Sequence, residues 1–481
     1  MNFIKKNFNI GKDFLELITH SKNYVLAQFL TMGLAFITMP IFTRLMSPED
    51  YGVMSVFTSF VGIISIIFGL GVGGAITRYY YEDKDDFFDF LNSNVWLIII
   101  ASVTLTGLAI IFRNKLQTFL NIPFGMIYIA FGIAIPQAIF QLYKSYLRAS
   151  KRSKKLASLD VIGALVGTGL AILIMIQMNE DRYYAKAIGQ AVSAIMMFLL
   201  TFWFLRKEIN FNLKKEHLSY SLIFGLPIIL HLLSGNILNT FDQIIINQLV
   251  GQHQTGIYSV AYKIGMIQSL ISTGILRAWT PIFYDKLNKG KYEDINALAK
   301  KYAFIVMFVA IFLIFFTKEI ITILADKRYH EALGIIPIII VSYFFLFLYT
   351  MYVNYAFYEK KTKNIAAITI IAGGVNILLN YLLIPSFGYI VAAWTTLISY
   401  VVLFLLHYIN VKWIIKIKRI TNIKIFILPT LLLFLFSVFY YLLTEYVEYY
   451  TLNLIIRVLV FSLFSYIFYQ IFKNNFKEHI K

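Results

Sequence analysis

About fourteen long apolar stretches follow one another along this chain, each near the length that a helix needs to cross a bilayer. Short loops separate these stretches, and no loop is long enough to form a soluble domain. Hydrophobic residues make up 59% of the sequence and charged residues only 14%, against about 25% charged residues in a typical soluble domain. We therefore predict an all-α membrane protein whose function resides in its spans and short loops.

The predicted spans share high hydropathy and few charges. They cover residues 22–43, 52–78, 93–112, 124–147, 157–178, 184–205, 219–247, 257–283, 301–324, 333–357, 365–384, 389–410, 425–443 and 452–472.

Basic residues are distributed unevenly among the loops. Clusters occur in residues 151–155 and 412–419, whereas the turns that follow Gln248 and Ile384 contain no Lys or Arg. Because cytoplasmic loops of membrane proteins are enriched in Lys and Arg, this alternation predicts that both termini face the cytoplasm. The net charge of +18 is then explained by anchoring against the lipid bilayer at the span ends, and we expect no nucleic-acid partner.

Several kinds of chemistry are disfavoured. The chain has no cysteine, which excludes a thiolate metal site and a cysteine nucleophile, and its seven histidines form no HExxH motif, so we predict no metal site and no cofactor. The glycines at 69, 71, 73 and 74 lie inside an apolar span without a following Lys-Ser/Thr pair, so they do not form a nucleotide loop. Close helix packing or a bend is the interpretation we favour for them, and also for Gly163 and Gly167.

The chain contains an internal repeat. Leu45, Gly52 and Ser55 recur 204 positions later as Leu249, Gly256 and Ser259, and residues 185–200 align with residues 391–406 at a similar offset. Six spans per copy give both copies the same orientation, which is common in transporters that move two lobes around a central site. We predict an interfacial segment over 1–21, an N-lobe over 22–210, a C-lobe over 211–415, and two extra C-terminal helices over 416–481.

Two segments carry a family resemblance. They are residues 40–83, PIFTRLMSPEDYGVMSVFTSFVGIISIIFGLGVGGAITRYYYED, and residues 241–265, FDQIIINQLVGQHQTGIYSVAYKIG. The chain resembles the bacterial polysaccharide transporters, or Wzx-type oligosaccharide-lipid flippases, of the MATE-like MOP superfamily. The resemblance implies a plasma (inner) membrane protein that flips undecaprenyl-diphosphate-linked oligosaccharide to the outer leaflet by alternating access, for O-antigen, capsule or another exopolysaccharide. It also implies a transporter rather than an enzyme, with a polysaccharide polymerase and a chain-length regulator as partners.

Such a cargo needs positive charge along its path, and Arg binds phosphate oxygens well because its planar fork is bidentate. Arg277 lies inside the eighth span, where we expect it either to contact diphosphate in a cavity or to snorkel or form an ion pair. Arg78 is a second diphosphate candidate, with anchoring at the span end as its alternative. Arg44 is a third, with a helix cap or a salt bridge to Glu49 or Asp50 as its alternative.

Three further residues are candidates for coupling or gating. Asp242 and Lys263 lie at similar depths in consecutive spans, so an ion pair would offset the cost of burying either alone. The carboxylate would otherwise exchange a coupling ion, with H+ and Na+ both left open. His231, near the middle of the seventh span, could titrate near neutral pH or simply bond a neighbouring helix.

Two other functional classes stay open at this point. An ion-coupled drug or cation antiporter of the same superfamily would share the architecture, but it would favour acidic residues in its cavity. A membrane polysaccharide polymerase or glycosyltransferase would need a larger outer loop with catalytic residues than this chain provides.

Overall fold

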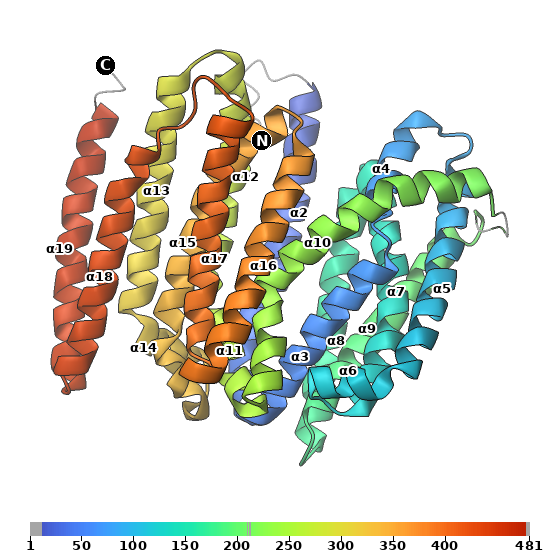
Figure 1. The fold of residues 1–481 in the computed structure, drawn as a ribbon, viewed down its shortest axis with the longest axis horizontal. Coiled ribbons are helices and arrows are strands. Elements are labelled where there is room, and N and C mark those ends of the chain that lie inside the picture. The colour runs from blue at the N-terminus through green and yellow to red at the C-terminus, as the bar shows by residue number, and fades with distance from the viewer. Residues whose placement is uncertain (1–11, 209, 211–212, 478–481) are drawn as a thin grey trace. The chain divides into compact units, whose positions relative to one another are not determined.

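The computed structural model describes residues 12–208, 210 and 213–477. Within these residues the chain is almost entirely helical and forms no strand (Figure 1). Thirteen helical segments in the described part of the chain are long and apolar enough to cross a membrane. The predicted class, an all-α multi-span membrane protein, is therefore confirmed.

The described residues pack into two compact units. Unit 1 holds the chain up to Ser259 together with residues 324–329 and 380–389, and unit 2 holds the remainder. The helices that lie wholly in unit 1 are α2 (Lys12–Leu45), α3 (Pro48–Phe68), α4 (Gly73–Glu82), α5 (Phe87–Ile111), α6 (Arg113–Leu120), α7 (Phe124–Ala149), α8 (Ser153–Gln177), α9 (Tyr183–Leu205) and α10 (Lys215–Leu249).

The later helices belong mainly to unit 2, although α11, α14, α16 and the 3-10 helix η1 each cross a unit boundary. They are α11 (Gln252–Gly265), α12 (Ile267–Asn288), α13 (Tyr292–Phe315), α14 (Thr317–Leu324), η1 (Lys327–Gly334), α15 (Ile336–Tyr358), α16 (Thr362–Phe387), α17 (Val391–Ile409), the π-helix η2 (Asn410–Ile414), the 3-10 helix η3 (Ile423–Phe426), α18 (Ile427–Tyr446) and α19 (Tyr450–Lys477).

One predicted span is not a single helix. The expected eighth span, residues 257–283, is divided at Met266, where α11 ends and α12 begins. It does not belong to the thirteen apolar segments found among the described residues. The physical reason is composition, because the part of α12 within this span carries Arg277 together with polar residues such as Gln268 and Thr273.

The N-terminal prediction falls partly outside the described residues, which begin at Lys12. From there α2 continues without interruption to Leu45. The predicted interfacial segment over 1–21 and the lobe boundaries at 210 and 415 therefore stay predictions.

The glycine run produces a break between α3 and α4. Leu70 and Gly71 both have positive φ angles, of 49° and 64°, a conformation that glycine adopts without steric cost. A Cβ on Gly71 would overlap the Gly225 carbonyl of α10, and a Cβ on Gly225 would overlap the Leu70 carbonyl. Both predicted roles of the run, close packing and a bend, are confirmed.

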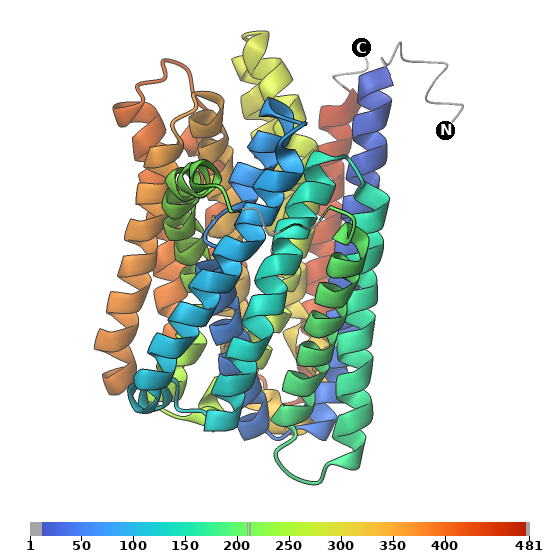
Figure 2. The same cartoon turned by 90° about the vertical axis from the view of Figure 1, so that its right-hand side faces the viewer.

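A second pair of glycines holds α8 against α9. A Cβ on Gly189 would overlap the Gly167 carbonyl, and Gly163 faces Ser193 and Met197 at van der Waals distance. Small residues allow helix backbones to approach closely in membranes, where packing supplies most of the association energy. Figure 2 shows α5, α7, α8 and α9 running side by side in unit 1.

The two copies of the repeat meet at equivalent positions. A Cβ on Gly52 of α3 would overlap the carbonyl of Gln252, and a Cβ on Gly256 of α11 would overlap the carbonyl of Pro48. Since Gly52 corresponds to Gly256 and Pro48 to Gln252 at the repeat offset of 204, the contact is reciprocal, as at a two-fold axis. Glycine is required on both sides of it.

Candidate functional site

Unit 1 contains a cavity of about 750 Å³ that is lined by both apolar and polar side chains. It lies beside the α3–α4 break and is bounded by α7, α8, α9 and α10. Its lining includes three basic residues, one acidic residue and several amides and hydroxyls, namely Lys144, Arg148, Lys186, Asp160, Gln137, Gln141, Gln190, Ser65, Ser145, Thr168 and Ser193.

Two of the basic residues lie near the end of α7. The Lys144 Nζ is 2.9 Å from the Asp160 carboxylate on α8, so this pair is close to neutral. Arg148, one turn further along α7, donates from Nη2 to the Ser145 hydroxyl at 2.8 Å. Gly73 lies beside the same hydroxyl, where a Cβ would stand only 2.8 Å from it. The break between α3 and α4 thus makes room for this polar end of the cavity.

The third basic residue, Lys186, lies near the start of α9. Its Nζ is 4.8 Å from the centre of the Phe42 ring on α2, a distance typical of a cation–π contact. One turn along the same helix, the Gln190 Oε1 is buried and has no hydrogen-bond partner among the described atoms. An amide oxygen in that condition is costly unless a ligand or water completes its bonding.

Neutral polar groups connect the two basic ends. The Ser65 hydroxyl donates to Gln137 at 3.0 Å, and the Ser193 hydroxyl donates to the Gly163 carbonyl at 2.7 Å. The stretch of α7 from Gln137 to Arg148 is about 16 Å long at 1.5 Å per residue. The cavity is therefore elongated along the helices and carries positive charge toward both ends.

The three predicted phosphate contacts lie elsewhere in the chain. Arg277 is an exposed residue of α12 in unit 2. Arg78 is exposed on α4, where its Nε lies 2.5 Å from Glu82 and its guanidinium lies 4.4 Å from the Phe224 ring centre. Arg44 is exposed and donates to the Pro40 carbonyl at 3.5 Å. None of the three lines the unit 1 cavity, and their roles stay predictions.

Asp242, in contrast, lies in a dense polar network. It is 1% exposed and accepts hydrogen bonds from the Tyr258 hydroxyl at 2.8 Å and the Asn380 amide at 2.6 Å. Lys263 is partly buried and belongs to unit 2, so its predicted pairing with Asp242 stays a prediction. His231 is partly buried on α10, and its Nδ1 has no hydrogen-bond partner among the described atoms.

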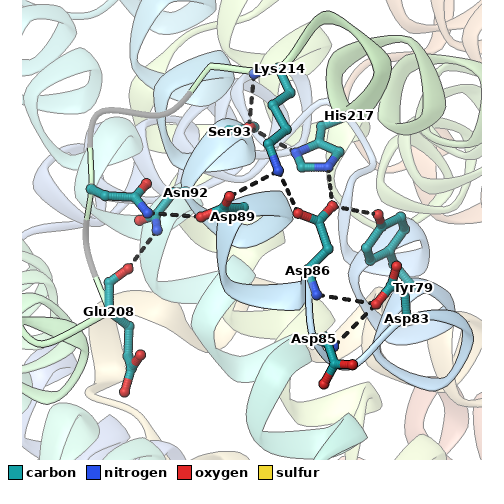
Figure 3. A network of polar contacts seen from close by, with 11 residues as sticks. Tyr79, Asp83, Asp85, Asp86, Asp89, Asn92, Ser93, Glu208, Lys214 and His217 are labelled. Carbon is teal, nitrogen blue, oxygen red and sulfur yellow. Dashed lines mark hydrogen bonds and ion pairs between the residues drawn. The ribbon is translucent and has the colours of Figure 1, made fainter.

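A separate network ties the start of α10 to the turn between α4 and α5 (Figure 3). The Asp86 carboxylate lies 2.5 Å from the Lys214 Nζ and 2.6 Å from the His217 Nε2. It also accepts a hydrogen bond from the Tyr79 hydroxyl at 2.9 Å. Lys214 reaches Asp89 as well, at 2.9 Å. This cluster fixes three chain segments to one carboxylate.

The network shifts the acidity of its members. Desolvation alone would raise the pKa of Asp86, but hydrogen bonds from Lys214, Tyr79 and His217 outweigh it and lower the pKa to about 2. The hydrogen bonds to Asp86 and Asp89 raise the pKa of Lys214 above its ordinary value. Both groups are therefore held in their charged forms.

Sequence reasoning did not identify the basic residues of the cavity. Lys144 and Arg148 lie at the end of a predicted span, where anchoring to lipid headgroups is the ordinary explanation. Their separation by four residues, which places them on one face of α7, was the available signal. Lys186 was the stronger signal, because it lies at the end of a span that the predicted topology assigns to the outer side, where basic residues are scarce.

The duplicated helical fold, the broken spans and an elongated cavity inside one helical unit define a membrane transporter. Residues 22–286, more than half of the chain, match the family described as polysaccharide biosynthesis protein, and residues 227–382 match the family described as MatE. The chain belongs to the polysaccharide biosynthesis protein family. This membership confirms the resemblance to the flippase branch of the MOP superfamily, and the prediction of a transporter rather than an enzyme.

Individual relatives agree with this assignment. The chain is 24% identical to the probable low-salt glycan biosynthesis flippase Agl15 of Haloferax volcanii, over 82% of this chain and 83% of that protein. It is 23% identical to the capsular polysaccharide biosynthesis protein CapF of Staphylococcus aureus, over 80% and 97%. Its fold is similar to the lipid II flippase MurJ in an inward closed conformation, with a TM-score of 0.72 and 17% identity over 94% of this chain and 99% of that chain.

Proposed function

We propose that this protein translocates an undecaprenyl-diphosphate-linked oligosaccharide from the cytoplasmic to the outer leaflet of the plasma membrane, and that the unit 1 cavity binds the diphosphate. The observation that carries the proposal is the arrangement of Lys144, Arg148 and Lys186 around one cavity with a single carboxylate. Three bases and one acid leave the lining with an excess of positive charge, which suits an anionic headgroup.

The physics of the cargo supports this assignment. A diphosphate that leaves headgroup water loses hydration that fixed charges and donors must replace. Arg148 can bind phosphate oxygens bidentately, and Lys186 offers a compact point charge toward the other end of the cavity. The amides of Gln137 and Gln190 can exchange hydrogen bonds with sugar hydroxyls. In this proposal the two basic ends hold the headgroup in succession as it crosses.

The exposed arginines have supporting roles in the proposal. Arg277 and Arg78 contact the diphosphate as it enters or reorients, and Arg44 meets it during release. Arg78 would have to leave its ion pair with Glu82, which is a small cost because exposed ion pairs contribute little to stability.

Asp242 is the best candidate for coupling transport to an ion gradient. It is a buried carboxylate whose two oxygens face hydroxyl and amide donors from Tyr258 and Asn380. In this proposal it exchanges H+ or Na+, with Lys263 controlling its affinity and His231 as a further coupling or gating residue. A polysaccharide polymerase and a chain-length regulator are the proposed partners, O-antigen, capsule or another exopolysaccharide is the product, and both termini lie in the cytoplasm.

The charge of the cavity argues against a transporter of cationic drugs. Such a cargo needs uncompensated carboxylates, and the acidic residue of this lining, Asp160, already faces Lys144 at 2.9 Å.

The decisive experiment measures the movement of a fluorescent undecaprenyl-diphosphate oligosaccharide between leaflets of vesicles that contain the purified protein. We expect Arg148→Gln to lower the initial rate about tenfold, as loss of one charge-assisted phosphate contact of ~1.4 kcal/mol would do. Arg206→Gln is the matched control, because Arg206 lies over the exposed Trp203 ring and does not line the cavity.

Two results would contradict the proposal. Wild-type vesicles that move the lipid no faster than protein-free vesicles, across several sugars and ion gradients, would exclude the flippase function. Equal rates for wild type, Arg148→Gln and Lys186→Gln would place the diphosphate path outside the unit 1 cavity. Arg277→Gln and Arg78→Gln, measured in the same assay, test the other path.

A further inference from the structure

Unit 1 has a second, smaller cavity of about 430 Å³ at the ends of five helical segments. Its volume lies within the range of about 300–1,000 Å³ that is typical of ligand pockets. The lining is rich in aromatic and basic residues, namely Tyr80, Lys84, Phe87, Phe88, Tyr143, Tyr146, Arg152, Lys155, Phe204, Leu205 and Glu208. We call it the aromatic pocket.

Aromatic rings build the floor of this pocket. Tyr143 and Tyr146 are 1% and 6% exposed. Tyr143 stacks on Phe204 with ring centres 6.2 Å apart, and Tyr146 stacks on Phe87 at 5.5 Å. Within the part of the chain that the structure describes, neither tyrosine hydroxyl has a hydrogen-bond partner. Both side chains line the pocket, so a ligand bound there can accept hydrogen bonds from the two hydroxyls.

Cations line the pocket above these rings. The Lys155 Nζ lies 3.2 Å from the centre of the Phe204 ring and 5.6 Å from that of Tyr143, and the Arg152 guanidinium lies 5.6 Å from that of Tyr146. Among the described residues, none of Lys84, Arg152 and Lys155 has an acidic partner within 4 Å. Glu208 is the carboxylate of this lining, and it is exposed.

The start of α8 strengthens the positive potential. Its first turn contains Lys154 and Lys155 and no acidic residue, and Arg152 precedes it. Helix N-termini favour negative charge, so basic residues at this place are unfavourable on their own. A bound anion removes the repulsion and gains the dipole contribution as well.

The position of the pocket identifies the source of the anion. Its lining residues lie within a few residues of the ends of membrane-spanning segments, which close at Glu82, Ala149 and Leu205 and open at Phe87 and Ser153. This is the depth of lipid headgroups. We infer that the aromatic pocket binds the phosphate of an anionic phospholipid headgroup, with Arg152 and Lys155 as charged contacts and the hydroxyls of Tyr143 and Tyr146 as further donors.

Native mass spectrometry of the full-length protein in detergent tests this inference. Phosphatidylglycerol is titrated against phosphatidylcholine with the same acyl chains, and glycerol 3-phosphate is titrated separately. We expect retention of phosphatidylglycerol with about tenfold preference, and a loss of about tenfold in Lys155→Gln, the change that ~1.4 kcal/mol produces. Tyr143→Phe, which removes only a hydroxyl, should also weaken retention.

Lys154→Gln is the matched control. It removes the same charge from the same turn, but Lys154 is exposed and does not line the pocket. If Lys154→Gln and Lys155→Gln reduced lipid retention equally, or if phosphatidylglycerol were not preferred, the lipid would be attracted only to a basic surface. Either result would contradict binding in the aromatic pocket. If glycerol 3-phosphate bound as tightly as the lipid, the pocket would be a site for soluble phosphate compounds and not for a membrane phospholipid. Because the readout is lipid retention, these outcomes are independent of the flippase assay.

Discussion

Single residues matter most clearly for this fold where two helices contact each other through glycine. Gly52 and Gly256 allow α3 and α11 to approach until backbone meets backbone, and Gly71 and Gly225 do the same for the α3–α4 break and α10. In a membrane such contacts have little help from the hydrophobic effect between helices, so close packing must supply the association energy. A methyl group at any of these four positions would separate the helices.

Asp86 is the residue whose ionisation should matter most for stability outside the spans. Because its pKa is lowered to about 2 in the folded protein from an ordinary 3.8, its stabilising contribution is complete above pH 4 and disappears as the pH falls toward 2. We expect Asp86→Asn to lower the melting temperature in detergent at pH 6, and the difference from wild type to shrink below pH 4.

Asp85→Asn is the control for that measurement, since Asp85 is exposed in the same turn and forms no ion pair among the described residues. If the difference in melting temperature between Asp86→Asn and wild type stayed constant from pH 6 to pH 3, the network of Figure 3 would stabilise the fold through packing and not through the charge of Asp86.

Most residues of the candidate site could not be predicted from the sequence. Hydropathy identified nearly every span, because a helix that crosses lipid must be predominantly apolar along its length and can be recognised from the sequence alone. The cavity depends on which face each helix turns inward, and that is decided by packing between segments far apart in the chain, such as Lys144 against Asp160 or Gly73 beside Ser145. Lys144 and Arg148 look like ordinary headgroup anchors until α8 is placed beside them.

At the scale of elements, an ion pair with a fully buried arginine helps to hold α19 in place. Arg457 of α19 is fully buried, and its guanidinium contacts both Glu319 carboxylate oxygens, at 2.8 and 2.9 Å. Its Nε donates to Asn453 at 2.7 Å, and it also reaches the Phe315 carbonyl at the end of α13. Figure 1 shows α18 and α19 side by side. This pair docks the end of the chain to α14.

Removing one partner of such a pair should loosen α19. We expect Arg457→Met to cost about 3 kcal/mol, because it leaves Glu319 without its main counter-charge. Limited proteolysis after α18 and thermal unfolding measure the effect. The double variant Arg457→Met with Glu319→Leu should recover part of the loss, since no charge is then left unpaired. If the double variant unfolded at a lower temperature than Arg457→Met, other groups would be stabilising the Glu319 carboxylate.

At the scale of the whole molecule, the duplicated chain places equivalent turns in reciprocal contact beside a hydrogen-bonded pair, in which the His253 Nδ1 lies 2.7 Å from the Glu49 Oε1. These two residues are themselves related by the repeat offset. Both side chains are about half exposed, so the pair contributes little energy and can break readily. We predict that this contact between the two repeat copies opens and closes during transport.

The lack of any cysteine makes this movement testable. In the variant Glu49→Cys with His253→Cys, a short cleavable bis-maleimide should link α3 to α11 and stop lipid transport, and cleavage of the linker should restore it. Each single cysteine variant treated with the reagent is the control. Full transport by the linked protein would mean that the transport cycle leaves this contact closed.

The pairing of Glu49 with His253 also has a consequence for how such a contact can arise. At the axis of a homodimer each residue meets its own copy, so a glutamate there would face a glutamate and a histidine a histidine. In one polypeptide that contains both copies the two positions can differ, and here one is a glutamate and the other a histidine. The duplicated chain thereby forms an interaction that two identical subunits could not form at the same place.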